Sequence, residues 1–275
     1  MKYIEKVYSE IENKYDYKKN LVVMSNQLAR KSTLFNALEH KIFLTALSQI
    51  NNIDNEGFVQ INKTEIHRLL DVDHRNMKKI RDNLDNLMYK SMIKFGNDEE
   101  FIDGMLITKV KTDRSNFYIK FDEDYMPLLI DLKGQFTMYH LMNVVKFKSK
   151  FSIALFQYLR SQFTGEYLIQ RIRITTKSLK ELFGLSEIEY MNKTSGEFDR
   201  ANFEKKTIRL AIKEINETSE CRMTIEEFKK NYLNRRVHTY EIAYSLKNSE
   251  GHRTTDQFED VLPYEQLNFD DMIEI

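Results

Sequence analysis

The sequence contains few of the residues that form disulfides, tight turns or membrane spans. Its 275 residues include one cysteine, 2 prolines, 8 glycines and no tryptophan. The lone Cys221 excludes an internal disulfide, and the charged N-terminus lacks the apolar core of a signal peptide, so we expect an intracellular, cytoplasmic protein. So little glycine and proline argues against collagen-like or linker-rich architecture. No apolar run approaches the roughly 18–20 residues of a membrane helix, so we expect no membrane partner.

A net charge is also lacking, since 42 lysines and arginines balance 42 aspartates and glutamates. The charges are nevertheless unevenly distributed. Residues 248–275 hold eight acids and one base, and the remaining residues hold 41 bases and 34 acids. We interpret this as a modestly basic body followed by an acidic tail, which leaves nucleic acid open as a partner. The 18 Phe and 15 Tyr supply apolar surface for two compact domains, the number expected for this length.

One short stretch occurs twice. The sequence "KTEIHRLLDV" at residues 63–72 follows the alternating run "FVQIN", and "TKSLKELFGL" at residues 176–185 follows "RIRIT". The apolar positions that coincide are Ile66 with Leu179, Leu69 with Leu182, Leu70 with Phe183, and Val72 with Leu185. The surrounding segments repeat as well, in the order helix, strand, short helix, long helix and strands. We infer an internal duplication of one structural unit, too widely spaced to be a solenoid repeat.

Apolar spacing predicts the helices of each unit. Helical periodicity begins at Thr33, the predicted N-cap, in "TLFNALEHKIFLTALSQI", and "SKFSIALFQYL" repeats the pattern in the second unit. The longer helices, "HRNMKKIRDNLDNLMYK" and "ANFEKKTIRLAIKEIN", are both amphipathic. Their predicted buried stripes are Met77, Ile80, Leu84, Leu87 and Met88 in the first unit and Ile208, Ile212 and Ile215 in the second.

Strand patterns follow each long helix. In the first unit, "SMIKF", "MLITKVKTD" and "NFYIKFDE" alternate as strands do, and "GNDEEFIDG" is predicted to be a polar corner between the first two. In the second unit, "RMTIEEFKK" and "VHTYEIAYSL" predict a hairpin with "NYLNRR" at its tip. Each long helix is therefore followed by a hairpin.

A short helix, a turn and a longer amphipathic helix form a helix-turn-helix, and a following hairpin adds the wing of a winged helix. The predicted fold class is α+β, with two tandem winged-helix domains, each a helix-turn-helix plus a β-hairpin wing, related by internal duplication. We place the N-terminal domain at residues 1–135, the C-terminal domain at 136–247 and the acidic tail at 248–275. The long helix of such a domain fits a major groove ~12 Å wide, which predicts a polar and basic outer face.

The second unit carries the stronger signal for DNA binding. Its long helix places five polar residues on the side opposite the isoleucines: Asn202, Lys205, Lys206, Arg209 and Lys213. Arg and Lys bind guanine edges and Asn binds adenine, so this face predicts base recognition. The predicted hairpin tip adds residues suited to phosphates or a narrow minor groove: Lys229, Lys230, Asn234, Arg235 and Arg236. Lysines on one amphipathic helix often only interact with solvent; the repeat and the basic tip favour DNA.

The first unit carries a more ambiguous signal. Its candidate DNA-binding residues are Arg75, Asn76, Lys78, Lys79 and Arg81. Asp82 and Asp85 interrupt the same outer face, and phosphates repel carboxylates. We therefore expect weaker or positioning contacts from the first unit and base recognition mainly from the second.

The N-terminal segment "LVVMSNQLARKSTLFNALEHKIFLTALSQIN" resembles the opening of plasmid replication initiator (Rep) proteins of the iteron-binding, theta-replicating type. In that family a "v-x-x-S-N-x-L" run precedes a helix with an "E-x-K-I-F/L-L-x-x-L" core. The residues that fit these patterns are Ser25, Asn26, Leu28, Glu39, Lys41, Ile42 and Leu47. The resemblance continues through both units over roughly residues 20–247, and the segment after Ser245 matches nothing in the family.

The resemblance implies an initiator that is not an enzyme and needs no cofactor. Monomers of such proteins bind direct repeats, called iterons, in double-stranded origin DNA. The second domain typically supplies the main specific contacts, and the first supplies further contacts and a dimer interface. Homodimers, in equilibrium with monomers, often repress the initiator's own promoter through an inverted repeat. Bound monomers bend the origin, help to open an adjacent A·T-rich segment and recruit host proteins, so a host replication initiator and helicase are implied partners.

Three other functions compete with this interpretation. A rolling-circle nicking enzyme requires a His-x-His pair, and no two of the six histidines are separated by one residue. The sequence also lacks a Gly-x-x-x-x-Gly-Lys phosphate loop, a His-Glu-x-x-His motif and a cysteine pair, so we expect neither an ATPase of that type nor a zinc site. A winged-helix transcriptional regulator is left open, because only tandem repeats beside the gene would separate it from an initiator. A protein-interaction winged helix is disfavoured by the basic helix of the second unit.

Overall fold

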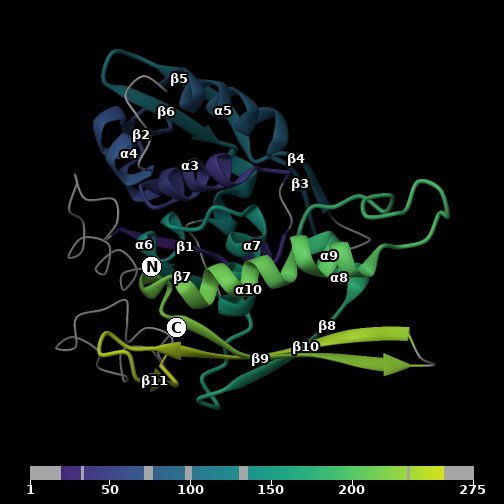
Figure 1. Cartoon of the computed structure of the whole chain (residues 1–275). Helices are drawn as coiled ribbons and strands as arrows, with labels where there is room; N and C mark the ends of the chain where they lie inside the picture. Colours follow the sequence, from purple (N-terminus) through teal and green to yellow (C-terminus); the bar gives the residue numbers. More distant parts are fainter. Residues whose placement is uncertain are drawn as a thin grey trace.

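The structure is a computed structural model that describes residues 20–31, 34–70, 77–96, 101–129, 136–233 and 236–256. Two units of mixed helix and sheet are stacked on either side of a middle layer (Figure 1). No helix within these ranges is both long enough and apolar enough to cross a bilayer.

The first unit repeats the predicted order of elements. Its strand β2 pairs with β6, and β6 pairs with β5, all antiparallel. An additional hairpin of β3 and β4 lies between the long helix and β5. The elements are α3 (Ala37–Leu47), β2 (Phe58–Asn62), α4 (Lys63–Leu70), α5 (Met77–Lys90), β3 (Met92–Gly96), β4 (Phe101–Met105), β5 (Ile107–Thr112) and β6 (Asn116–Phe121).

The second unit has the same topology. Its strand β8 pairs with β10, and β10 pairs with β9, so in both units the strand before the helix pair joins the second strand of the hairpin. This confirms the predicted α+β fold with two tandem winged helices. The elements are α7 (Lys150–Ser161), β8 (Gln170–Thr175), α8 (Thr176–Leu182), α9 (Arg200–Lys206), α10 (Ile208–Glu217), β9 (Met223–Leu233), β10 (Arg236–Lys247) and β11 (Arg253–Thr254).

The middle layer joins the two units. Strand β1 (Leu21–Ser25) pairs antiparallel with β7 (Phe136–His140), which comes from the other end of the first unit. Arg30, just after the short helix α2 (Asn26–Ala29), donates to the Oγ and the carbonyl of Ser161 at the end of α7. One uninterrupted hydrophobic cluster includes residues of both units. The units therefore share a single core, and the division at residue 135 stays a prediction.

The long helices bury the stripes that periodicity predicts. Ile80, Leu84 and Leu87 of α5 are buried, as are Ile208 and Ile215 of α10. Burying each such side chain contributes about 1.5–3 kcal/mol, and that gain holds both helices against their units. The predicted Met88 and Ile212 are partly buried against the same core, and the side chain of Met77 lies outside the described residues.

Two boundaries predicted for the first unit are wrong. The first helix begins at Ala37, not near Thr33, which lies outside the described residues. Asn36 caps it, because its carboxamide accepts from two amides of the first turn while Glu39 accepts from the backbone N–H of Asn36. The predicted polar corner contains strand β4, whose mixed polar and apolar residues hid its pairing with β3.

Residues 248–256, which we assigned to the tail, fold back onto the second unit. They form a turn and then β11, which pairs with the end of β10. Arg253 donates two bonds of 2.9 Å to Glu226 on β9, and this guanidinium lowers the pKa of that carboxyl. Gly165 approaches so closely that a side chain there would collide with the carbonyl of Thr255. The rest of the acidic segment lies outside the described residues.

Candidate nucleic-acid interface

The long helix predicted for the second unit is in fact two helices that meet at Thr207. The first, α9, is capped by Asp199, whose carboxylate accepts from the amide of Asn202 at 3.0 Å. Thr207 has φ of −118° and ψ of −88°, and its Oγ1 donates to the carbonyl of Phe203 at 2.6 Å. Threonine bonding to the carbonyl four residues earlier bends helices. The prediction of one continuous helix was therefore wrong.

The bend divides the predicted DNA-binding face between two helices. Lys205 and Lys206 are exposed on α9, Arg209 and Lys213 are exposed on α10, and Asn202 is half-buried. Within the described part of the chain neither Lys205 nor Lys206 has an ion-pair partner, whereas Lys213 lies 3.8 Å from the carboxylate four residues further on. Among the cations of α9 and α10, Lys205 and Lys206 are therefore the most available to an external anion.

Glu204 connects the helix pair to the wing. Its side chain is only 4% exposed, accepts from the Tyr240 hydroxyl at 3.1 Å and lies 2.6 Å from the Lys230 ammonium. The Arg209 guanidinium lies 4.0 Å from the same carboxylate and 5.3 Å above the ring of Phe228. A buried carboxylate is costly unless it is paired, so these contacts favour one arrangement of helix and wing. Arg209 is thereby oriented before any ligand arrives.

The wing of the second unit, which is the hairpin of β9 and β10, is longer than predicted. Residues 231–233 and Arg236, which we placed at the hairpin tip, belong to β9 and β10. Lys229 and Arg236 are exposed, and Lys230 is half-buried by its contact with α9. Lys229 also lies 2.6 Å from a carboxylate two residues earlier on β9. The predicted Asn234 and Arg235 lie outside the described residues.

One positioning residue escaped sequence analysis. Arg200 immediately precedes the predicted long helix "ANFEKKTIRLAIKEIN", but it is the first residue of α9. Its guanidinium donates to Thr176 on α8 and to the Tyr240 hydroxyl, both at 3.1 Å, and lies 5.4 Å above the Phe198 ring. Arg200 therefore ties both helices of the helix-turn-helix to the sheet. A signal was present, because an aspartate at 199 before an amphipathic run is typical of an N-cap.

The corresponding helix of the first unit has a mixed surface. Lys78, Lys79 and Arg81 are exposed on α5, and so are Asp82 and Asp85. The structure thus brings the predicted bases and the interrupting acids onto one helix, as the sequence indicated. The remaining candidates, Arg75 and Asn76, lie outside the described residues.

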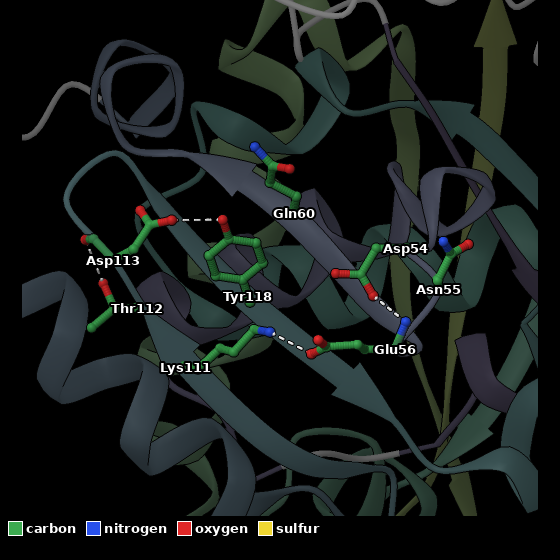
Figure 2. Close-up of a pocket in the computed structure, with 8 residues that line it drawn as sticks. All are labelled: Asp54, Asn55, Glu56, Gln60, Lys111, Thr112, Asp113 and Tyr118. Atoms are coloured by element: carbon green, nitrogen blue, oxygen red, sulfur yellow. Dashed lines mark hydrogen bonds and ion pairs between the residues drawn. The ribbon is translucent and has the colours of Figure 1, made fainter.

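In the first unit, the hairpin of β5 and β6 borders an open hollow of about 530 Å³ (Figure 2). Its lining residues are Asp54, Asn55, Glu56, Gln60, Lys111, Thr112, Asp113 and Tyr118. Figure 2 shows that the polar groups already have partners within the hollow: Lys111 lies 2.9 Å from Glu56, and the Tyr118 hydroxyl donates to Asp113 at 2.7 Å. That bond and two backbone N–H bonds hold the Asp113 pKa at about 2. Three carboxylates and one lysine make the hollow a poor phosphate site.

The described residues contain no group of histidine, cysteine, aspartate or glutamate side chains that could hold a metal ion. The arrangement of the second unit instead suits a polyanion. It combines exposed cations on α9, an oriented guanidinium on α10 and exposed cations on an adjacent hairpin. Helix and wing could contact one groove and its flanking phosphates together.

Comparisons with known proteins agree with this topology. The family model described as "Initiator Replication protein, WH1" matches residues 21–160, and that described as "Initiator Rep protein, WH2" matches residues 175–244. No curated protein matches the sequence. The crystal structure of a Pi initiator protein in complex with iteron DNA superposes with a TM-score of 0.68 and 17% identity, covering 84% of this chain and 98% of that one. A structure of domains 2 and 3 of RctB gives a TM-score of 0.44 and 10% identity over 75% of this chain and 80% of that one.

Proposed function

This chain belongs to the initiator Rep protein family, and we propose that it is a plasmid replication initiator that binds iteron DNA at an origin. The observation that carries the proposal is the cationic surface of α9 and α10, locked beside a long wing by Glu204. The fold likeness to a Pi initiator protein described with iteron DNA supports the same conclusion. A duplex that lies across α9 would contact the wing at the same time.

The two units divide the work unequally in this proposal. The second unit supplies base recognition, with Arg209 as the principal contact and with Lys229 and Arg236 on phosphates. The first unit supplies accessory phosphate contacts, because exposed Asp82 and Asp85 weaken attraction along α5. If α5 and the α9–α10 helix pair bind one face of a duplex, they would enter major grooves about 10–10.5 bp apart.

A homodimer formed through the first unit is part of the proposal. The β3–β4 hairpin has no counterpart in the second unit, and Tyr125 anchors it by donating to the carbonyl of Ile93 at 2.9 Å. Apolar side chains exposed on or beside it are Tyr89, Met92, Phe101, Ile102 and Met105. An apolar patch of this kind marks a protein contact. We propose that dimers repress the promoter of their own gene and that monomers bind iterons, open the origin and recruit the host initiator and helicase.

A footprint of the purified protein on the DNA beside its own gene tests the binding step. We expect protection of tandem repeats, in steps of whole helical turns. Protection of an inverted repeat alone, together with failure of the gene and its flanking DNA to sustain a plasmid, would identify a transcriptional regulator instead. Absence of any protected sequence would refute both functions.

A further inference from the structure

The first strand of the wing, β9, ends in two apolar side chains just before Asn234 and Arg235, which lie outside the described residues. Tyr232 and Leu233, the last two residues of β9, are 63% and 57% exposed. Figure 1 shows that this hairpin runs alongside α10 and extends past the helix pair. Scattered exposed apolar residues are ordinary, but two adjacent ones at the end of a projecting hairpin are far from any core that would explain them.

The strand geometry places Tyr232 on the side of the hairpin that faces α9. Side chains alternate along a strand, so Phe228, Lys230 and Tyr232 share one face. Lys230 contacts Glu204 of α9 from this face, and Phe228 lies beneath the Arg209 guanidinium. Tyr232 therefore continues the same row roughly 7 Å beyond Lys230, toward whatever lies against α9. Leu233 points to the other face of the hairpin.

Backbone pairing and ring stacking fix the position of Tyr232 in the hairpin. Pairing continues to the end of the strands, where Tyr232 is opposite Val237 and Leu233 is opposite Arg236. A register shift between Val237 and Thr239 increases the local twist and so changes the direction of the tip. Stacking of Phe228 on the ring at 240, with centroids 5.5 Å apart, fixes the middle of the hairpin.

Charge identifies the occupant that this tip would meet. Lys229 and Arg236 are exposed on either side of the apolar pair, and Lys205 and Lys206 are exposed on α9. A surface with cations around a small apolar point matches DNA, where phosphates flank the apolar faces of stacked bases. Architectural DNA-binding proteins insert such apolar wedges between base steps and kink the duplex.

We propose that Tyr232 is a wedge that enters the minor groove and partly unstacks one base step when the second unit binds DNA, so that the wing kinks the duplex. The proposal rests on the DNA binding proposed above and adds the residue that deforms the DNA. The corresponding hairpin of the first unit, β5–β6, offers no such wedge, because its tip consists of Asp113, Arg114 and Ser115, with the Asp113 carboxylate accepting from the amides of Ser115 and Asn116.

The test uses the full chain with the substitution Tyr232→Ala. The probes are fragments of the DNA beside its gene, circularly permuted for gel mobility and carrying 2-aminopurine at successive base steps. We expect the wild-type complex to be bent and to show enhanced 2-aminopurine fluorescence at one step. The variant should lose both signals while its affinity changes less than about tenfold, because the phosphate contacts of Lys229 and Arg236 are kept.

Matched variants separate the wedge from other causes. Tyr167→Ala removes a tyrosine that is 66% exposed in the segment before β8, and it should leave the bend and the fluorescence unchanged. Tyr232→Phe should keep both signals, because its ring still fills a base step. A full bend in the DNA-bound Tyr232→Ala variant would overturn the wedge. Loss of self-association with the bend intact would overturn it too, and would assign Tyr232 to a protein contact. A wild-type protein that binds none of the fragments would refute the proposed function itself, and a wild-type complex that binds without bending would refute the wedge alone.

Discussion

The long helix of the first unit exposes acids among its bases, whereas the helix pair of the second unit exposes mainly bases. Asp82 and Asp85 lie on α5 beside its lysines, but on α9 the only acid, Glu204, is buried and joins the helix to the wing. Both units bury equivalent isoleucines and pair their strands in the same order. The comparison teaches that the core defines the fold and the solvent face decides what the unit binds, so duplication of a scaffold does not duplicate its function.

The hairpin of β5 and β6 in the first unit also differs from the hairpin of β9 and β10 in the second. That of the first unit is short and turns tightly through bonds to Asp113, with a polar tip. That of the second unit has strands of 11 and 12 residues and exposes Tyr232 and Leu233 at the end of its first strand. In the proposed function, the short hairpin with an aspartate in its turn contributes little to phosphate binding, whereas the long hairpin contacts the duplex beside α9.

The largest effect should come from the equivalent core positions of the two units. Ile80→Ala and Ile208→Ala each remove a fully buried side chain, so each should lower the free energy of unfolding by about 2–5 kcal/mol. Because one core joins the units, both substitutions should shift the same single transition in urea followed by circular dichroism. Separate transitions for the two units would contradict the shared core.

A second effect distinguishes His40, inside α3 of the first unit, from Ser149, which the sequence repeat aligns with it but which caps α7 of the second. His40 is buried near Gln157 and Lys150, and burial is the main cause that lowers its pKa from 6.5 to about 4. The unfolded chain therefore binds more protons than the folded chain between these pH values, so stability falls as the pH drops through this window. The loss should approach about 3 kcal/mol near pH 4.

Unfolding free energies measured from pH 7 to pH 4 test this effect. His40→Gln keeps a polar side chain that does not titrate, and it should flatten the profile across this window. Ser149→Ala is the control: it removes the N-cap of α7 but no titratable group, so it should lower stability by a similar amount at every pH and leave the slope unchanged. An unaltered slope in His40→Gln would assign the pH dependence to other groups.

The third effect compares an exposed cation of α10 in the second unit with one of α5 in the first. Arg209→Ala should weaken the specific site by about 1–3 kcal/mol and leave random DNA almost unaffected, because an oriented guanidinium distinguishes bases. Lys79→Ala should weaken both DNAs alike and lower the salt slope by about 0.9. Fluorescence anisotropy at several salt concentrations measures both quantities. Equal weakening of both DNAs by Arg209→Ala would reject base recognition by that residue.

The smallest effect should come from the acids of α5. The double substitution Asp82→Asn and Asp85→Asn removes two carboxylates from a face proposed to lie near phosphates. We expect binding to random DNA to strengthen by less than about 1 kcal/mol, since exposed charges interact weakly. Glu123→Gln removes an exposed carboxylate elsewhere in the first unit and should change nothing. If both variants behave alike, α5 does not face the DNA.

Local patterns were sufficient to predict the topology and the buried stripes. Ile80 and Ile208 follow helical spacing, and the alternating runs before the short helices form the predicted strands. The break at Thr207 escaped, because Thr207 is itself buried and fits the helical period while its hydroxyl bends the backbone. Contacts between distant segments escaped as well: Glu204 meets Tyr240 and Lys230 only after the hairpin folds over α9.

The pairing of β1 with β7 also constrains the order in which parts of the chain can fold during synthesis. A ribosome releases β1 early, but its partner β7 follows more than a hundred residues later, so the emerging polypeptide holds an unpaired apolar strand until about half of the chain has been made. The helices and hairpins in between close over short distances and so precede that join, because loop closure becomes costlier with length. Translation speed and chaperone access at this stage therefore bear on how much of the protein reaches its native form.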